Sequence, residues 1–152
     1  MSMPATLAKR PQFRGLPIPW TVQVTDGIPD FKRLEAHRVD KAYRQRLCFL
    51  CGQSMGKEVA FVGGPASAKS RLYTDGPNHE ACAVFAAETC PHLAGGKGFA
   101  DDRGLVPVPG QSTTSIDRAV ILITDGWKRG KTYTQANPPI RLRTFTSGKE
   151  GS

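Results

Sequence analysis

The chain lacks a long hydrophobic run. Its longest uninterrupted aliphatic stretch extends from Ala119 to Ile123, whereas a membrane-spanning helix needs roughly 20 apolar residues. After Lys9 and Arg10, where the apolar region of an export signal would lie, prolines at positions 11, 17 and 19 interrupt the segment. We therefore expect no transmembrane helix and no export signal, and we predict a cytoplasmic protein.

Carboxylates and apolar side chains are both in short supply. Thirteen Asp and Glu stand against 21 Lys and Arg, which leaves a formal net charge of +8 at pH 7. This surplus favours polyanions and acidic surfaces as partners, and neither a membrane nor a small-molecule substrate is predicted. Hydrophobic residues make up 39% of the chain, and 16 Gly and 12 Pro interrupt its regular elements. A length of 152 residues with this composition predicts one small, loop-rich core with appendages.

Asp-Gly dipeptides predict two hairpins. Residues 20–25 alternate apolar and polar side chains and are followed by Asp26-Gly27, a dipeptide that tolerates the positive φ angles of a tight turn. The apolar strand Arg118 to Thr124 leads through Asp125-Gly126 into residues 127–134 in the same way. Each pair of segments is expected to fold back on itself.

Two helices are predicted. Leu34 to Leu47 contains neither Gly nor Pro, and its residues Val39 and Tyr43 lie on one stripe with Leu47. A second helix is expected after Asn78, whose side-chain oxygen can accept the free amide hydrogens of a first turn. Together with the hairpins these helices predict an α+β fold.

Cysteine and histidine are few, but their spacing is informative. Cys48 and Cys51 form a C-x-x-C followed by glycine, the zinc-knuckle turn in which two thiolates bind one ion. His79 and Cys82 form H-x-x-C in the first turn of the second helix, where the i, i+3 spacing brings both side chains to one side. Three thiolates and an imidazole suit tetrahedral Zn²⁺ and leave no open position, so we predict a structural zinc site at Cys48, Cys51, His79 and Cys82.

Other interpretations of these residues remain. The C-x-x-C could be a redox pair, and His79 could be a surface residue near a helix start. Cys90 competes as fourth ligand, but on a continuous helix it lies about 16 Å beyond His79 along the axis, so we interpret it as a buried apolar thiol. His92 could replace a ligand if the chain folded back after Pro91, and otherwise it is a helix-terminal surface histidine.

A knuckle, a strand and a helix whose first turn completes the site resemble the treble-clef zinc motif. A wider set of residues resembles an uncharacterised family of small proteins from phages and actinobacterial genomes. These residues are Phe13-Arg14-Gly15-Leu16-Pro17-Ile18-Pro19-Trp20, Arg46-Leu47-Cys48-x-x-Cys51-Gly52, Val59-Ala60-Phe61-Val62, and His79-x-x-Cys82-Ala83 to Cys90-Pro91. The resemblance covers residues 13–94 and departs in the Gly63 to Arg71 loop. Because the family has no established activity, it implies the metal site and a phage or prophage setting, but no function.

Two enzymatic patterns are incomplete. Gly63 to Ser70 follows a predicted strand but has Ala68 where a P-loop has its second glycine, and Pro77 leaves no room for the helix that would hold the phosphates. We expect this segment to be an exposed basic loop. Treble clefs also support HNH nucleases, but His37 and His92 lack the neighbouring histidine or aspartate of that family. We therefore predict a protein without enzymatic activity, and keep an HNH-like nuclease as a minor alternative.

Basic residues indicate two classes of partner. Residues 118–143 hold six basic side chains against Asp125 alone, and the aromatic residues Trp127, Tyr133 and Phe145 among and beside them are candidates for stacking on bases. We therefore predict nucleic acid as the first choice of partner. The alternative is a protein-interaction module or inhibitor that acts on a host or defence protein with an acidic surface. The predicted contact residues are Lys69, Arg71, Lys128, Arg129, Lys131, Arg141 and Arg143.

These expectations give a linear domain plan for a small zinc-stabilised, treble-clef-like fold. The plan comprises an extended N-terminal arm (1–19), a zinc-binding domain (20–94), a flexible linker (95–115), a C-terminal β-hairpin extension (116–146) and a disordered tail (147–152).

Overall fold

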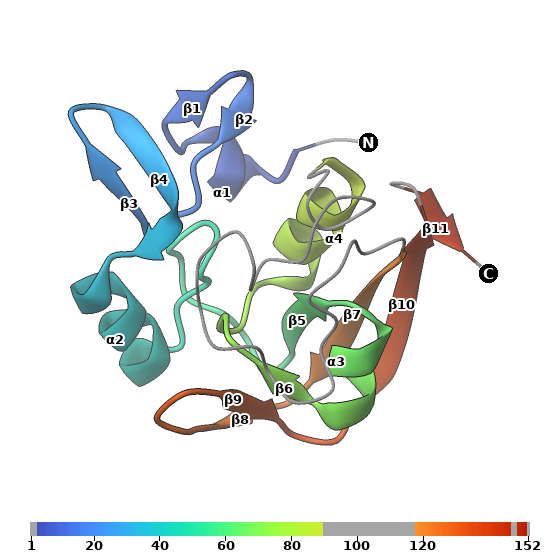
Figure 1. Ribbon diagram of the computed structural model, residues 1–152. Helices are drawn as coiled ribbons and strands as arrows, with labels where there is room; N and C mark the ends of the chain where they lie inside the picture. Colours follow the sequence, from blue (N-terminus) through green and yellow to red (C-terminus); the bar gives the residue numbers. More distant parts are fainter. Residues whose placement is uncertain (1–2, 90–117, 147–148, 152) are drawn as a thin grey trace.

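The computed structural model describes residues 3–89, 118–146 and 149–151 (Figure 1). Within them the protein is an α+β fold of four helices and small antiparallel sheets. The predicted linker (95–115) and the predictions for Cys90 and His92 lie outside the described residues. No helix in these ranges combines the length and the apolar character that crossing a bilayer demands.

A four-stranded antiparallel sheet forms the centre of the fold. Its strand order is β11-β10-β7-β5, and its strands are β5 (Val59–Gly63), β7 (Arg118–Thr124), β10 (Arg141–Thr146) and β11 (Lys149–Gly151). Residues 119–124 of β7 are all buried, because this strand carries apolar side chains on both faces and lies between two partners. One layer of the core packs Ala83, Val84 and Ala87 of helix α4 (Glu80–Thr89) against the sheet.

The structure corrects the predicted C-terminal extension (116–146). β7 does not form a hairpin with the next strand; it pairs with β5 of the predicted zinc-binding domain and with β10. The segment after Asp125-Gly126 instead builds a second sheet of β8 (Trp127–Arg129), β9 (Thr134–Ala136) and β6 (Leu72–Tyr73). A fully buried strand needs a hydrogen-bonding partner on each edge, because its backbone groups cannot reach water, and local turn chemistry could not reveal those distant partners.

The N-terminal region also differs from the extended arm predicted for residues 1–19. It forms the short helix α1 (Ala5–Ala8) and a hairpin of β1 (Gln12–Phe13) and β2 (Leu16–Pro17). Leu7 is only 2% exposed and belongs to the core. Elements this short have little intrinsic stability and form because they pack on the core. They are also too short to show a periodic pattern of apolar residues in the sequence.

The first predicted hairpin and both predicted helices are present. β3 (Val22–Thr25) pairs with β4 (Ile28–Leu34) through a turn in which Asp26 and Gly27 have φ of 54° and 78°, as a two-residue turn with both φ positive requires. Helix α2 (Ala36–Gln45) begins after Glu35, whose carboxylate accepts hydrogen bonds from the amides of His37 and Arg38. The second predicted helix is α4.

Two further segments are more regular than predicted. The segment expected to be an exposed loop after Gly63 contains helix α3 (Pro65–Ser70), which begins with proline at its first position and buries Ser67. The tail predicted as disordered (147–152) contributes β11, which pairs with residues 144–146 of β10. In both places tertiary packing stabilises short elements that the local sequence does not favour.

Candidate metal centre

The first half of the site is a turn that follows helix α2. Leu47 and Ser54 form an isolated antiparallel bridge, and the C-x-x-C lies between them. The amide of Gly52 donates to the carbonyl of Cys48 at 2.8 Å, and the amide of Cys51 donates to Cys48 Sγ at 3.5 Å. Gly52 has φ of +80°, which is the left-handed conformation that glycine adopts without strain. The predicted knuckle turn is therefore present.

The second half lies at the start of helix α4. His79 immediately precedes the helix and Cys82 lies in its first turn, and the backbone amide of His79 donates to Cys48 Sγ at 3.4 Å. Asn78 does not cap the helix as predicted. Its side-chain amide donates instead to the carbonyls of Ala60 and Gly76, which fixes the approach of the chain to the site.

The four predicted ligands converge. Their ligand atoms all lie within 4.8 Å of one another. His79 Nδ1 is 3.3 Å from Cys51 Sγ and 3.8 Å from Cys82 Sγ. A tetrahedral zinc ion with bonds of about 2.3 Å to sulfur and about 2.0–2.1 Å to nitrogen separates its ligand atoms by roughly 3.5–3.8 Å. The spacing of the side chains therefore fits one four-coordinate ion that Cys48, Cys51, His79 and Cys82 would hold.

A second interaction orients the imidazole. His79 Nε2 lies 2.9 Å from the carbonyl oxygen of Ser54 and is assigned as the donor, because that oxygen can only accept. Nδ1 is then the nitrogen whose lone pair would face a cation held by the three sulfurs. Histidine ligands of protein metal sites are oriented in this manner by an outer hydrogen bond that fixes their tautomer.

Burial argues against the alternative of a redox pair. Cys48, Cys51 and Cys82 are each 2% exposed or less, and all three are free thiols. Reactive cysteines are partly exposed, whereas buried ones are inert unless they bind a metal. His79 is half-buried and hydrogen-bonded rather than a free surface residue.

The N-terminal segment closes the site, which the sequence did not indicate. Leu7 belongs to the same core cluster as the three cysteines, and Thr6 Oγ1 lies 3.9 Å from Cys82 Sγ. Leu122 of β7 is part of that cluster as well. An ion at this site would therefore be enclosed by segments from distant parts of the chain, and no periodic pattern around Leu7 signals this in the sequence.

The thiols are too close together to be charged at the same time without a cation. Hydrogen bonds with Cys48 and Cys51 raise the pKa of Cys82 far above its usual value, whereas hydrogen bonds from Cys48 and Cys82 lower the pKa of Cys51. The pKa of His79 is raised to about 10, first by its hydrogen bond with Cys48. Protons thus balance the negative charge of the cluster when no ion is there, and a divalent cation would displace them.

The predicted contact arginines are mostly engaged within the protein. Arg141 forms ion pairs with Glu58, at 2.9 Å, and with Glu80, and Arg143 reaches the other oxygen of Glu80 at 2.8 Å. Because Glu80 adjoins His79, these pairs connect β10 to the first turn of α4, which holds two of the candidate ligands. The two arginines therefore stabilise the neighbourhood of the site instead of forming a free basic surface.

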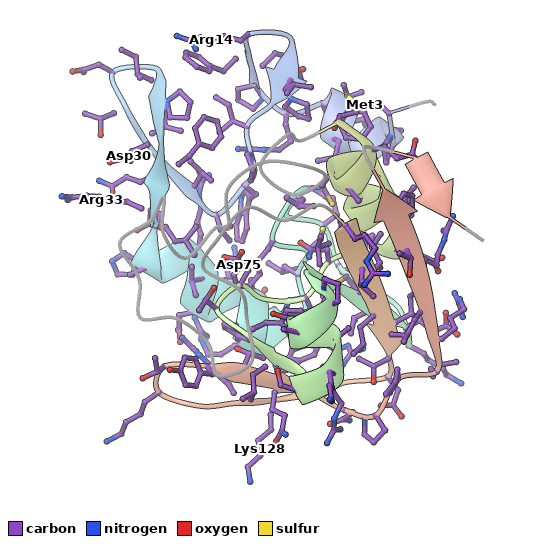
Figure 2. The ribbon with its side chains drawn as sticks, turned by 45° about the vertical axis from the view of Figure 1, so that its right-hand side comes forward. Met3, Arg14, Asp30, Arg33, Asp75 and Lys128 are labelled. Atoms are coloured by element: carbon purple, nitrogen blue, oxygen red, sulfur yellow. The ribbon has the colours of Figure 1, made fainter. Side chains whose placement is uncertain are left out.

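Arg129 and Arg71 are also occupied. Arg129 lies over the ring of Tyr43 and pairs with Asp40 at 3.1 Å. Arg71 donates to the carbonyl of Ala136 at 3.2 Å. No hydrogen bond or ion pair is found for Lys69, Lys128 or Lys131, which are exposed, among the residues described; Figure 2 shows Lys128 directed away from the body of the protein.

Two of the aromatic residues proposed to stack on bases have other contacts. Phe145 is fully buried in the core. Trp127 packs between Tyr43, at 6.2 Å between ring centroids, and the guanidinium of Arg46, at 5.0 Å from its ring. Phe145 is therefore inaccessible to a base, and the partly buried ring of Trp127 already has two partners within the protein.

Gly52 permits a direct test of the knuckle geometry. A Cβ at this position would lie 2.7 Å from Cγ of Trp20 and would be held at a positive φ. We expect Gly52→Ala to lower the free energy of unfolding by about 2–4 kcal/mol, because it combines backbone strain with a steric clash. Thermal and denaturant unfolding would measure the loss.

Gly56→Ala is the matched control for Gly52→Ala. Gly56 lies four residues further on, and nothing lies within 4 Å of a Cβ placed there. Its substitution is expected to change the free energy of unfolding by less than about 0.5 kcal/mol. Equal stabilities for the two variants would contradict the tight turn described here.

Comparisons with protein-family models, with curated proteins and with solved structures found no match to this chain.

Proposed function

We propose that Cys48, Cys51, His79 and Cys82 hold a structural zinc ion and that the protein is a non-enzymatic binding module. The donor set supports zinc, since three thiolates and an imidazole in tetrahedral spacing suit this ion and leave no position for substrate or water. The knuckle and the ligand pair at the start of α4 support a treble-clef-like arrangement. The phage setting remains a prediction from the family resemblance.

A catalytic role receives little support from the geometry. An HNH-like nuclease needs a histidine that activates water beside a divalent ion. Of the histidines in the described residues, His79 is directed at the sulfurs and hydrogen-bonded to the carbonyl of Ser54, and His37 lies on the exposed surface of α2; His92 lies outside these residues. Incubation of supercoiled plasmid with the protein and Mg²⁺ or Mn²⁺ is expected to leave it uncut.

We propose a protein with an acidic surface as the partner, rather than nucleic acid. The observation that carries this choice is the distribution of free side chains. Four of the seven predicted contact residues are engaged within the protein, which leaves Lys69, Lys128 and Lys131. Large apolar side chains are exposed elsewhere on the molecule, and aliphatic groups in contact surfaces are typical of protein partners. The net charge of +8 would steer an acidic partner towards it.

Salt-dependent binding to a 20-base-pair DNA duplex tests this choice. We expect weak binding at low salt that disappears near 150 mM NaCl, because only three of the seven predicted contact residues, Lys69, Lys128 and Lys131, have no partner in the described part of the chain. Replacing Lys69, Lys128 and Lys131 together by alanine should change this weak binding by at most about tenfold. Tight binding at 150 mM NaCl that the triple variant abolishes would establish nucleic acid as the partner instead.

A further inference from the structure

The two N-terminal hairpins leave an unusual apolar surface exposed. β1–β2 and β3–β4 each form a sheet of only two strands, and they lie side by side, apart from the four-stranded sheet (Figure 1). Of the six large hydrophobic residues that are exposed in the described part of the chain, four lie in these hairpins: Leu16, Val24, Ile28 and Phe31. Two-stranded ribbons are marginally stable in water, and exposed apolar surface does not stabilise them. Contiguous apolar surface of this kind is typical of sites that bind a partner.

Three of these four exposed side chains lie on the faces that the hairpins turn towards each other. The rings of Phe13 and Phe31 lie 6.5 Å apart, and Leu16 is directly opposite Phe13 in the β1–β2 pair. Val24 lies directly opposite Pro29, which is buried, so the two side chains share one face of the β3–β4 ribbon. We call Phe13, Leu16, Val24 and Phe31 the hairpin surface. Ile28, which is 62% exposed, pairs with Thr25 on the other face.

One arginine borders the hairpin surface, and a second lies on the outer side of β4. The guanidinium of Arg14 lies 5.1 Å from the centre of the Phe13 ring. Arg33, which is 73% exposed, is only 3.6 Å from Asp30 in an open ion pair of the kind that contributes little. Figure 2 shows Arg14 at the tip of the β1–β2 hairpin, whereas Arg33 lies with Asp30 at the outer side of β4, away from the hairpin surface. A carboxylate beside an apolar segment bound to this surface would find positive charge at Arg14.

We propose that the hairpin surface binds an extended segment of a partner protein whose large apolar side chains are flanked by carboxylates. The proposal rests on the proposed function as a module for acidic protein partners, and it assigns the contact to residues 12–34. Leu16 and Val24 favour a protein over nucleic acid, because bases stack on aromatic rings and gain little from aliphatic groups. A second copy of this chain is disfavoured as occupant, because two molecules of charge +8 repel each other.

The test uses three fluorescent nonapeptides and the full-length protein. In the first peptide glutamates alternate with leucines around a central phenylalanine, in the second lysines replace the glutamates, and in the third serines replace the apolar residues. We expect the first peptide to bind at least about tenfold more tightly than either of the others in fluorescence anisotropy. Equal binding of all three, or no binding of the first, would overturn the proposal.

Variants locate the contact. Phe31→Ser is expected to weaken binding of the first peptide by about tenfold or more, since truncated aromatic anchors cause losses of this size. Arg14→Glu should weaken it too and should reverse the preference for glutamate over lysine. Ile28→Ser, on the opposite face of the same ribbon, is the matched control and should bind as the unmodified protein does. A loss with Ile28→Ser equal to that with Phe31→Ser would contradict the assignment.

Two further measurements separate the remaining outcomes. Amide chemical shifts of the unmodified protein should change within residues 12–34 on addition of the first peptide, and this readout does not depend on the folding of any variant. Displacement of the peptide by oligothymidylate, or a concentration-dependent dimer lost in Phe31→Ser, would overturn the proposal in favour of nucleic acid or self-association. The zinc content of the protein is measured separately. A metal-free protein that still binds the first peptide would refute the metal assignment but not the proposed peptide binding at the hairpin surface.

Discussion

Replacing Cys48 by serine is expected to abolish metal binding and the folded state together. Cys48 is completely buried and its sulfur accepts hydrogen bonds from two backbone amides, so it joins the two halves of the site. Structural zinc contributes about 10–16 kcal/mol of apparent binding free energy in small domains, whereas a whole domain is stable by only about 5–15 kcal/mol. The binding free energy lost with the ion is therefore as large as the whole free energy of unfolding, and the variant should not fold. Circular dichroism with metal analysis of the same sample would show whether the cooperative transition disappears.

Cys90 offers a matched control for this substitution. The sequence predicts that it is not a ligand, and it lies outside the described residues. Cys90→Ser should therefore retain one zinc ion per chain. A Cys48→Ser protein that melts cooperatively at the temperature of the unmodified protein, or a Cys90→Ser protein that loses the ion, would refute the four-ligand assignment.

A chain that ends at residue 117 is expected not to fold, even with zinc in excess. Such a chain lacks β7, whose side chains of Ile121, Leu122 and Ile123 are all completely buried. Each of these three contributes about 1.5–3 kcal/mol through burial alone, and together they approach the stability of a whole domain. β5 would also lose the neighbour with which its five residues pair.

Dispersion of amide signals in the presence of zinc distinguishes the outcomes for the shortened chain. A narrow range of shifts is expected, as in an unfolded chain that holds metal only loosely. A well-dispersed spectrum with one bound ion would show that residues 20–94 form an independent zinc-binding domain, as the sequence had suggested. The shared sheet of β5 and β7 would then be dispensable.

The two halves of the candidate metal centre could be predicted from the sequence because the information in each half is local. Each half-site consists of two ligands three residues apart, and the first turn of a helix or a knuckle brings such ligands together irrespective of the rest of the fold. The β3–β4 turn is similar, since Asp26 and Gly27 alone favour the positive φ angles that it needs. In both cases the structural unit is no longer than the sequence pattern that encodes it.

What the sequence did not reveal depends on contacts between distant residues. Nothing near β7 indicates that it pairs with β5 rather than with the strand after Asp125. The sequence predicts Arg141 to be a free contact residue. Its ion pair with Glu80 could not be foreseen, because the two residues are 61 positions apart in the chain. Leu7 likewise belongs to the core although no periodic pattern surrounds it. Pairing of strands, neutralisation of charges and closure of the site are decided by tertiary packing.

X-ray absorption at the zinc edge of the purified protein tests the central claim most directly, because it reports the identity and distance of the ligand atoms. The account predicts one zinc ion per chain with three sulfur neighbours at about 2.3 Å and one nitrogen neighbour at about 2.0–2.1 Å. A protein that contains no zinc, or whose zinc is surrounded by oxygen and nitrogen alone, would contradict it.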